Sequence, residues 1–182
     1  EFFVLAHRVA DLFGHDRVEV IGEELGGQAD AQAVEVIVEP LCVVGDGPLR
    51  QELKALTAEL EIERAVDFKG YRTDVANLLQ QAKVLLMASD REGFPFAIVE
   101  AMCSGLVPVS TAVGTIKDLI IHEKNGLLVP PNDVKHLSRV MSCLLNDDKL
   151  YKRLRKQALQ SRAQFSYANA MEVWGAWIRR LS

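Results

Sequence analysis

The chain has 182 residues, of which 49% are hydrophobic and 25% charged, a balance typical of a soluble globular protein long enough to bury a core. Its net charge of -4 argues against a nucleic-acid-binding protein, because a phosphate backbone is normally met by a basic surface. Three cysteines, none in a CxxC pair, predict buried free thiols rather than disulfides or a metal site, and they are Cys42, Cys103 and Cys143.

The first 40 residues are the least regular part of the sequence. Apolar residues at helical spacing predict a helix over residues 2–13, ended by Gly14. Residues 18–21 and 34–38 suggest two strands, and partial disorder of this stretch is the alternative. Because the sequence begins at Glu1 without Met, apparently inside a helix, we expect it to be part of a longer protein.

From Leu41 onward, short apolar runs alternate with helical patterns. Strands are expected at residues 41–44, 66–68, 83–88, 107–110 and 126–129. Helices are expected at residues 49–60, 75–82, 95–104, 116–122, 133–145, 150–165 and 167–181. Continuous apolar strands are buried on both faces, so the pattern predicts a doubly wound, mostly parallel α/β sheet of the Rossmann type. Ligands bind such sheets at the carboxyl ends of the strands. This places the candidate loops at residues 45–48, 70–74, 89–95 and 111–115.

The loop before the third of these helices carries the strongest pattern. The N-terminus of a helix is a natural anion site, Gly93 allows close approach, and Pro95 sits where a missing N–H costs least. Glu92 lies just before the helix and Glu100 inside it, and two carboxylates are good acceptors for sugar hydroxyls. On spacing alone, we favour the alternative that Glu92 is a helix N-terminal charge and Glu100 an exposed helix residue.

Two other glycine turns follow predicted strands. Gly45 and Gly47 could approach a phosphate or sugar closely, but Arg50 stands where a dinucleotide fingerprint has its third glycine. Gly114 and Thr115 form another strand-to-helix turn with helix-start N–H groups.

The fourth loop contains an aromatic and a basic residue. Tyr71 and Arg72 could pack on a nucleobase, and a tight turn capped by Asp74 is an equally good interpretation.

The order of these pieces resembles the C-terminal domain of the GT-B family 4 retaining glycosyltransferases. The matching segments include Val-Val-Gly-Asp-Gly-Pro-Leu-Arg (43–50), Val-Asp-Phe-Lys-Gly-Tyr (66–71) and Val-Leu-Leu-Met-Ala-Ser-Asp-Arg-Glu-Gly-Phe-Pro (84–95). They continue with Ile-Val-Glu-Ala-Met-Cys-Ser-Gly-Leu-Val-Pro-Val (98–109), Val-Gly-Thr-Ile-Lys-Asp (113–118) and Asn-Gly-Leu-Leu-Val-Pro-Pro-Asn-Asp (125–133). The resemblance covers most of the chain, and its two glutamates separated by seven residues are its most specific signature.

The resemblance implies a nucleotide-sugar donor, UDP- or GDP-linked, and no metal or other cofactor. It implies that Glu92 is the catalytic residue that faces the donor sugar, and that Glu100 holds the ribose. The remaining donor-binding residues that it implies are Gly93, Phe94, Pro95, Gly45, Gly47, Tyr71, Arg72, Gly114 and Thr115.

Several features depart from the family pattern. The family usually has Gly-Arg on the first strand and a Lys soon after, which clamp the diphosphate, and Arg8 and Arg17 do not match this context. Thr115 replaces a second glycine, and Asp118 replaces glutamate. We therefore expect residues 1–182 to form the donor-binding domain, with residues 1–40 atypical or partly disordered, and the N-terminal acceptor-binding domain to be absent.

The resemblance also concerns the cellular setting and the partners. It implies surface polysaccharide or glycolipid synthesis on lipid-linked acceptors, in the cytoplasm or at the inner face of a membrane. The isolated chain is expected not to transfer sugar to an acceptor.

A non-catalytic nucleotide-sugar-binding module is the main alternative. A sugar-nucleotide epimerase is disfavoured because the sequence has no suitably placed His, and a nicotinamide enzyme is disfavoured because the third glycine is missing. Basic residues in 149–162 are interpreted as a solvated helix face.

Overall fold

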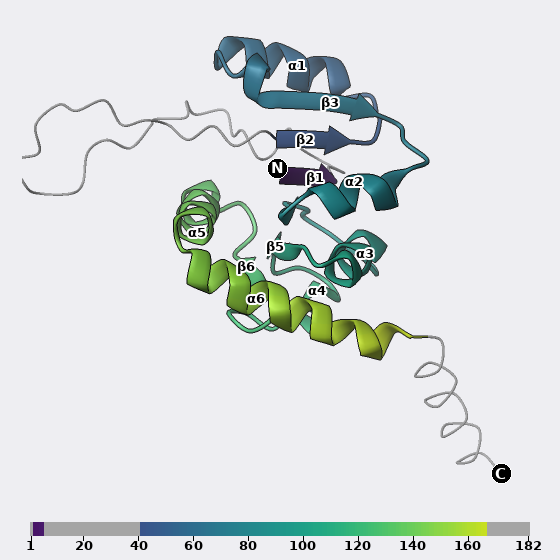
Figure 1. Ribbon diagram of the computed structural model, residues 1–182. Coiled ribbons are helices and arrows are strands. Elements are labelled where there is room, and N and C mark those ends of the chain that lie inside the picture. Colours follow the sequence, from purple (N-terminus) through teal and green to yellow (C-terminus); the bar gives the residue numbers. More distant parts are fainter. Residues whose placement is uncertain (1, 6–40, 167–182) are drawn as a thin grey trace, which may run out of the picture.

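The structure is a computed structural model that describes residues 2–5 and 41–166 (Figure 1). Within these residues, six parallel strands form one sheet in the order β3-β2-β1-β4-β5-β6. The strands are β1 (Phe2–Leu5), β2 (Leu41–Val44), β3 (Val66–Gly70), β4 (Val84–Met87), β5 (Val107–Thr111) and β6 (Leu127–Val129). The predicted parallel, Rossmann-like α/β class is therefore confirmed.

The prediction of a helix over residues 2–13 is wrong for residues 2–5. Phe2–Leu5 is a strand whose backbone pairs with β2 on one side and β4 on the other. Four consecutive apolar residues suit a strand covered on both faces as well as they suit a helix, and periodicity cannot separate the two over so short a run. The rest of that helix, and the strands expected at 18–21 and 34–38, lie outside the described residues.

The predicted helices from residue 49 to residue 165 are confirmed, with changes at their ends. They are α1 (Arg50–Glu59), α2 (Val75–Gln81), α3 (Phe96–Ser104), α4 (Ile116–Leu119), α5 (Val134–Asn146) and α6 (Asp148–Ser161), with 3-10 turns η2 (Glu63–Ala65) and η3 (Arg162–Phe165). α6 begins earlier than predicted because the Asp147 carboxylate accepts the N–H groups of Lys149 and Leu150, both at 2.9 Å. The helix predicted over 167–181 lies outside the described residues.

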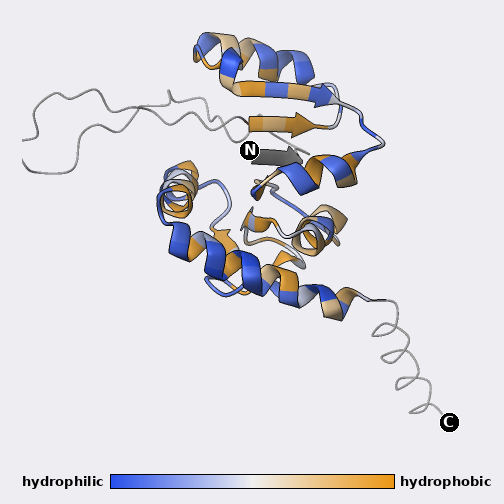
Figure 2. Ribbon diagram, viewed as in Figure 1, coloured by the Kyte–Doolittle hydropathy of each residue, from blue (hydrophilic) through white to orange (hydrophobic). Residues whose placement is uncertain are grey.

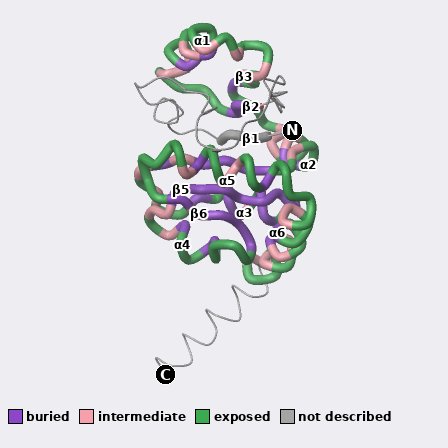
Figure 3. The backbone as a smooth tube through the Cα atoms, turned by 90° about the vertical axis from the view of Figure 1, so that its left-hand side faces the viewer, coloured by how far each residue is buried: buried purple, intermediate pink, exposed green. Residues whose placement is uncertain are grey.

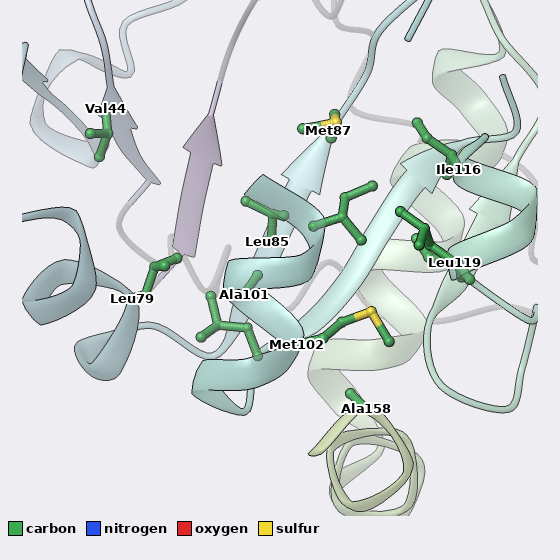
Figure 4. Packing of buried hydrophobic residues seen from close by; sticks show 12 residues of the cluster. Val44, Leu79, Leu85, Met87, Ala101, Met102, Ile116, Leu119 and Ala158 are labelled. Atoms are coloured by element: carbon green, nitrogen blue, oxygen red, sulfur yellow. The ribbon is translucent and has the colours of Figure 1, made fainter. Parts of the chain in front are cut away.

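The two faces of the sheet are covered by different sets of helices, with α6 contributing to both through Leu154 and Ala158. Every residue of β4 and of its neighbour β5 is buried, and Figure 3 shows the buried tube of β5 in purple. The alternate side chains of β4 enter two separate hydrophobic clusters. Val84 and Leu86 pack with residues of α1, α5 and α6. Leu85 and Met87 pack with residues of α2, α3 and α4, as Figure 4 shows. Burial on both faces, at about 1.5–3 kcal/mol for each large side chain, fixes the positions of the loops that leave the strands.

The prediction of three buried thiols is wrong for two of them. Cys103 and Cys143 are exposed, and Cys42 is half-buried. Cys103 follows Met102, which is fully buried, and Cys143 precedes the buried Leu144. Successive helical residues point about 100° apart, so an apolar run within a helix reaches both the core and the solvent.

Candidate functional site

The carboxyl edge of the sheet is where the candidate loops meet. From β1 the chain reaches β2 and β3 on one side, then returns to β4 on the other side of β1. The strand order therefore reverses between β1 and β4, and such a reversal opens a crevice at the carboxyl ends where ligands bind. Because all six described strands are parallel, the described loops that follow β2, β3, β4, β5 and β6 lie at the same edge (Figure 1). The loop after β4, which contains Glu92, therefore lies at the reversal point.

A buried serine orients the Glu92 carboxylate. The Ser89 hydroxyl donates to Glu92 Oε1 at 2.6 Å, and the Ser89 carbonyl accepts the Thr111 hydroxyl, also at 2.6 Å. Ser89 and Thr111 are both buried, so they hold this part of the loop against the end of β5. A carboxylate has about four acceptor positions, so a single bond orients Glu92 without saturating it.

The loops after β4 and β5 are in direct contact. The Thr115 hydroxyl donates to the Gly93 carbonyl. Gly114 has a φ of +50°, and a Cβ at this position would overlap the carbonyl oxygen of Glu92. The sequence suggested two separate glycine turns, and the structure joins Glu92, Gly93, Gly114 and Thr115 into one unit.

The N-terminus of α3 lies in the same part of the molecule. Pro95 occupies the cap position, and no side chain forms a capping hydrogen bond there. The rings of Phe94 and Phe96 meet edge to face, with centroids 5.1 Å apart, and both are exposed. Glu100 is exposed one turn farther along α3. An uncapped helix start carries partial positive charge and attracts anions.

The loops after β2 and β3 form a second contact group. The Gly45 N–H donates to the Gly70 carbonyl at 2.9 Å, and the φ of Gly45 is +126°, a conformation that favours glycine. The Arg50 guanidinium lies 3.2 Å from where a Cβ of Gly70 would be. Asp46 holds it there through a 2.9 Å ion pair and also accepts the Gly47 N–H at 2.9 Å. In the sequence, Arg50 was noted only because it stands where a dinucleotide fingerprint has its third glycine. The structure shows that it places a fixed cation at this turn.

Arg72 and Asp74 pair with each other on the loop after β3. Arg72 donates twice to the Asp74 carboxylate, at 2.8 and 2.7 Å. Because Arg72 hydrogen-bonds to it, the pKa of the Asp74 carboxyl lies below its ordinary value. Asp74 occupies the N-cap position of α2, but its side chain forms no capping hydrogen bond there, so the alternative of a turn capped by the Asp74 side chain is wrong. Tyr71, beside this pair, is 79% exposed.

Three residues to which the sequence analysis gave no role support the two contact groups. Ser89 and Thr111 received none, because a serine and a threonine at strand ends are common. Arg50 was visible only as a departure from a glycine pattern. Their roles follow from contacts between loops, such as the bond from Thr111 to Ser89 across 22 positions of sequence.

Two hollows of the described surface bear on the location of the site. The smaller one lies at the carboxyl ends of β4, β5 and β6 and is lined by Ala88, Asp90, Thr111, Val129, Pro130, Asn132, Asp133, Val134 and Leu137. The larger one, of about 730 Å³, runs along α6, away from the glycine loops. We place the candidate site at the carboxyl edge because the oriented carboxylate, the glycine turns and the uncapped helix start coincide there.

The described residues contain neither a candidate metal-binding cluster nor a membrane-spanning helix. None of their His, Cys, Asp and Glu side chains form a group of three or more suited to a metal ion. Of the helices in this part of the chain, none has the length and apolar character needed to cross a membrane.

Known proteins are similar in sequence to this chain over most of its length. The chain is 33% identical over 134 residues to the N-acetyl-alpha-D-glucosaminyl L-malate synthase of Bacillus anthracis, covering 74% of this chain and 35% of that protein. It is 35% identical over 133 residues to an alpha-1,4-N-acetyl-D-galactosaminyltransferase of Campylobacter jejuni, covering 72% and 36%. The chain thus spans about a third of the length of these relatives.

Solved structures share the fold. HepE of Anabaena, in complex with UDP-glucose, superposes with a TM-score of 0.65 at 27% identity, covering 69% of this chain and 36% of that one. The isolated C-terminal domain of a group 1 glycosyl transferase, LpcC of Francisella tularensis, has a TM-score of 0.64 at 21% identity, a similarity that concerns the fold alone. The chain covers 68% of that domain, so its fold is that of a GT-B C-terminal domain. Residues 32–161 match the family described as glycosyl transferases group 1, and the chain belongs to this family.

Proposed function

We propose that this chain is the donor-binding part of a family 4 retaining glycosyltransferase, which moves a sugar from a nucleotide-sugar to an acceptor. One observation carries the proposal. The Glu92 carboxylate, oriented by Ser89, lies in the loop that touches Gly114 and Thr115, directly before the uncapped start of α3. Acceptors for sugar hydroxyls and donors for a diphosphate are thereby adjacent.

In this proposal the diphosphate binds where the backbone can approach it. Gly93, Phe94 and Pro95 precede the first turn of α3, and Gly114 and Thr115 border the same loop. The N–H groups of a helix start favour negative charge, and this matters most when the leaving diphosphate gains charge. The bond between the anomeric carbon and the phosphate oxygen breaks, and a bond from that carbon to the acceptor hydroxyl oxygen forms with the same configuration. The hydroxyl proton passes to the departing diphosphate.

The glutamates have different tasks. Glu92 accepts hydrogen bonds from donor sugar hydroxyls and positions the anomeric carbon, which makes it the residue nearest to the chemistry. Glu100 accepts from the ribose hydroxyls. Charge-assisted bonds of this kind contribute about 1.5–3 kcal/mol each.

The nucleobase lies toward β2 and β3. Gly45 and Gly47 form the floor of its pocket, and Tyr71 offers an exposed ring on which a base can stack. Arg72, held in place by Asp74, flanks that ring. We infer a UDP-sugar before a GDP-sugar, because HepE was solved with UDP-glucose. The donor is a substrate, and the proposal needs no metal or other cofactor.

The acceptor belongs to a separate domain. The Campylobacter relative is named for an acceptor linked through diphosphate to undecaprenol, which supports a lipid-linked acceptor in polysaccharide or glycolipid synthesis. We propose that an acceptor-binding domain completes the enzyme at the cytoplasmic face of a membrane. Because catalysis requires the anomeric carbon to lie between two domains, this chain by itself transfers no sugar.

Titration of the ¹⁵N-labelled chain with UDP and UDP-glucose tests donor binding. We expect amide shifts at Gly93, Gly114 and Thr115. Glu100→Gln should weaken the binding of both ligands by roughly 10- to 100-fold, the value of one charge-assisted hydrogen bond. Glu92→Gln should weaken the binding of UDP-glucose and leave UDP binding nearly unchanged.

Glu59→Gln is the matched control, since Glu59 is exposed at the far end of α1. A folded chain whose amides at the carboxyl edge do not respond to millimolar UDP would rule out donor binding. Binding in the chain, combined with an intact parent protein that transfers no sugar, would instead support the non-catalytic module.

A further inference from the structure

Positive charge is concentrated on one helix of an acidic chain. Residues 148–165 contain six basic residues and one acidic residue, a balance of +5, whereas the whole chain carries -4, so the remainder carries -9. The six are all exposed and are Lys149, Lys152, Arg153, Arg155, Lys156 and Arg162. We call them the α6 basic face, and in Figure 2 most of the ribbon in the first half of α6 is coloured hydrophilic.

The spacing of these residues places four of them on the same side of α6. Lys149, Lys152, Arg153 and Lys156 recur at intervals of three and four residues, so they share one side of α6. Leu154 and Ala158, which are fully buried, hold the opposite side against the core. Because its apolar side is already occupied, α6 can meet a partner only through its charged side.

The larger of the two hollows runs beside this face. Among the described residues it is lined by Tyr151, Lys152, Arg155, Lys156, Leu159, Gln160, Arg162 and Ala163, and it has a volume of about 730 Å³. Tyr151 and Leu159 are half-buried, so the groove has an apolar floor and a cationic rim. This combination suits an amphiphile with an anionic headgroup.

The arginines are partly fixed by the protein. Arg153 donates to the Glu123 carbonyl at 2.5 Å, and the Nε of Arg155 donates to the Gly105 carbonyl at 3.1 Å. A guanidinium has five N–H donors, so each retains others for a phosphate. Pre-positioned cations lose less side-chain entropy on binding.

We propose that the α6 basic face binds the anionic phospholipid headgroups of a membrane surface. The charge complements such a surface, which attracts basic residues and repels the acidic remainder of the chain, so the protein would be oriented with α6 toward the lipid. A nucleic acid is disfavoured because the rest of the molecule repels an extended polyanion. The contact is electrostatic and peripheral, and it therefore weakens as salt rises.

Vesicle co-sedimentation of the full chain is the test. The vesicles contain either phosphatidylcholine alone or phosphatidylcholine with about 30% phosphatidylglycerol, which supplies the anionic headgroups. We expect binding to the anionic vesicles only, falling steeply between 50 and 300 mM salt. A lysine near an anionic surface contributes roughly fivefold, so Lys149→Gln, Lys152→Gln and Lys156→Gln together should reduce partitioning on the order of a hundredfold.

A matched triple variant changes the net charge equally elsewhere. Lys83→Gln, Lys117→Gln and Lys135→Gln are exposed positions on other parts of the chain, and they should reduce partitioning far less. Circular dichroism checks that both variants are folded. Equal losses in the two variants, equal binding to neutral vesicles, or tighter binding to a DNA duplex than to anionic vesicles would each overturn the proposal. The assay contains no nucleotide-sugar, so its failure is distinct from failure of the proposed function.

Discussion

Gly114 shows how much one residue can decide at the proposed donor site. Its φ of +50° is unfavourable for other residues, and its Cα faces the carbonyl of Glu92 so closely that a Cβ would overlap it. The glycine therefore allows the loops after β4 and β5 to touch. This contact helps to fix the backbone on which Glu92 stands.

Gly114→Ala should destabilise the fold by about 2–4 kcal/mol, because the methyl group meets backbone rather than a flexible side chain. Urea unfolding measures this difference. Gly47→Ala is the control, since nothing lies within 4 Å of a Cβ there, and it should cost less than about 1 kcal/mol. Equal losses in the two variants would contradict the contact between Gly114 and Glu92.

At the scale of elements, a buried asparagine connects segments that are distant in sequence. Asn125 precedes β6, and its Oδ1 accepts the Ile121 N–H at 2.7 Å. Its Nδ2 donates to the Leu119 carbonyl at 3.1 Å and to the Ser161 hydroxyl at 3.2 Å. The side chain therefore ends α4, shapes the turn into β6 and attaches the end of α6 to both.

Asn125→Ala should cost about 2–4 kcal/mol of unfolding free energy, because it removes a buried side chain together with its bonds to the Ile121 N–H and the Leu119 carbonyl, the second of which is a buried hydrogen bond. Asn146→Ala is the comparison. Asn146 is exposed and its side chain donates to the Ser142 carbonyl, so its loss should cost under about 1 kcal/mol. Thermal unfolding of the two variants at equal pH measures the difference, and similar melting temperatures would argue against the linking role of Asn125.

At the scale of the whole molecule, β1 joins the two halves of the sheet. It pairs with β2 on one side and β4 on the other, so the β2–β3 pair connects to β4, β5 and β6 through it. The reversal of strand order, and with it the proposed ligand crevice, depends on this position.

Val4→Pro should therefore disrupt the sheet as a whole. Val4 pairs with Val43 and with Leu86, and proline removes an N–H from a strand that has neighbours on both sides. We expect a loss of about 3 kcal/mol or more and a broader unfolding transition. Val4→Ala retains the N–H and serves as the control. A proline variant as stable as the alanine variant would show that β1 does not hold the halves together.

The sequence by itself determined the strands and helices from residue 41 to residue 165. Continuous apolar runs such as Val84–Met87, and the glycine after α3, are local signals, and Gly105 ends that helix in a left-handed conformation with a φ of +85°. The parallel sheet and the location of the candidate loops at its carboxyl edge followed from them. The family also followed, because the order of several motifs is far more specific than any one of them.

Only the tertiary structure decided how those parts meet. It made Phe2–Leu5 a central strand, exposed Cys103 and paired the side chain of Asp74, a candidate turn cap, with Arg72. It also joined Gly93 to Thr115 across 22 positions. Such contacts depend on two segments that are brought together when the sheet buries both its faces, and neither segment carries a local pattern that reveals its partner.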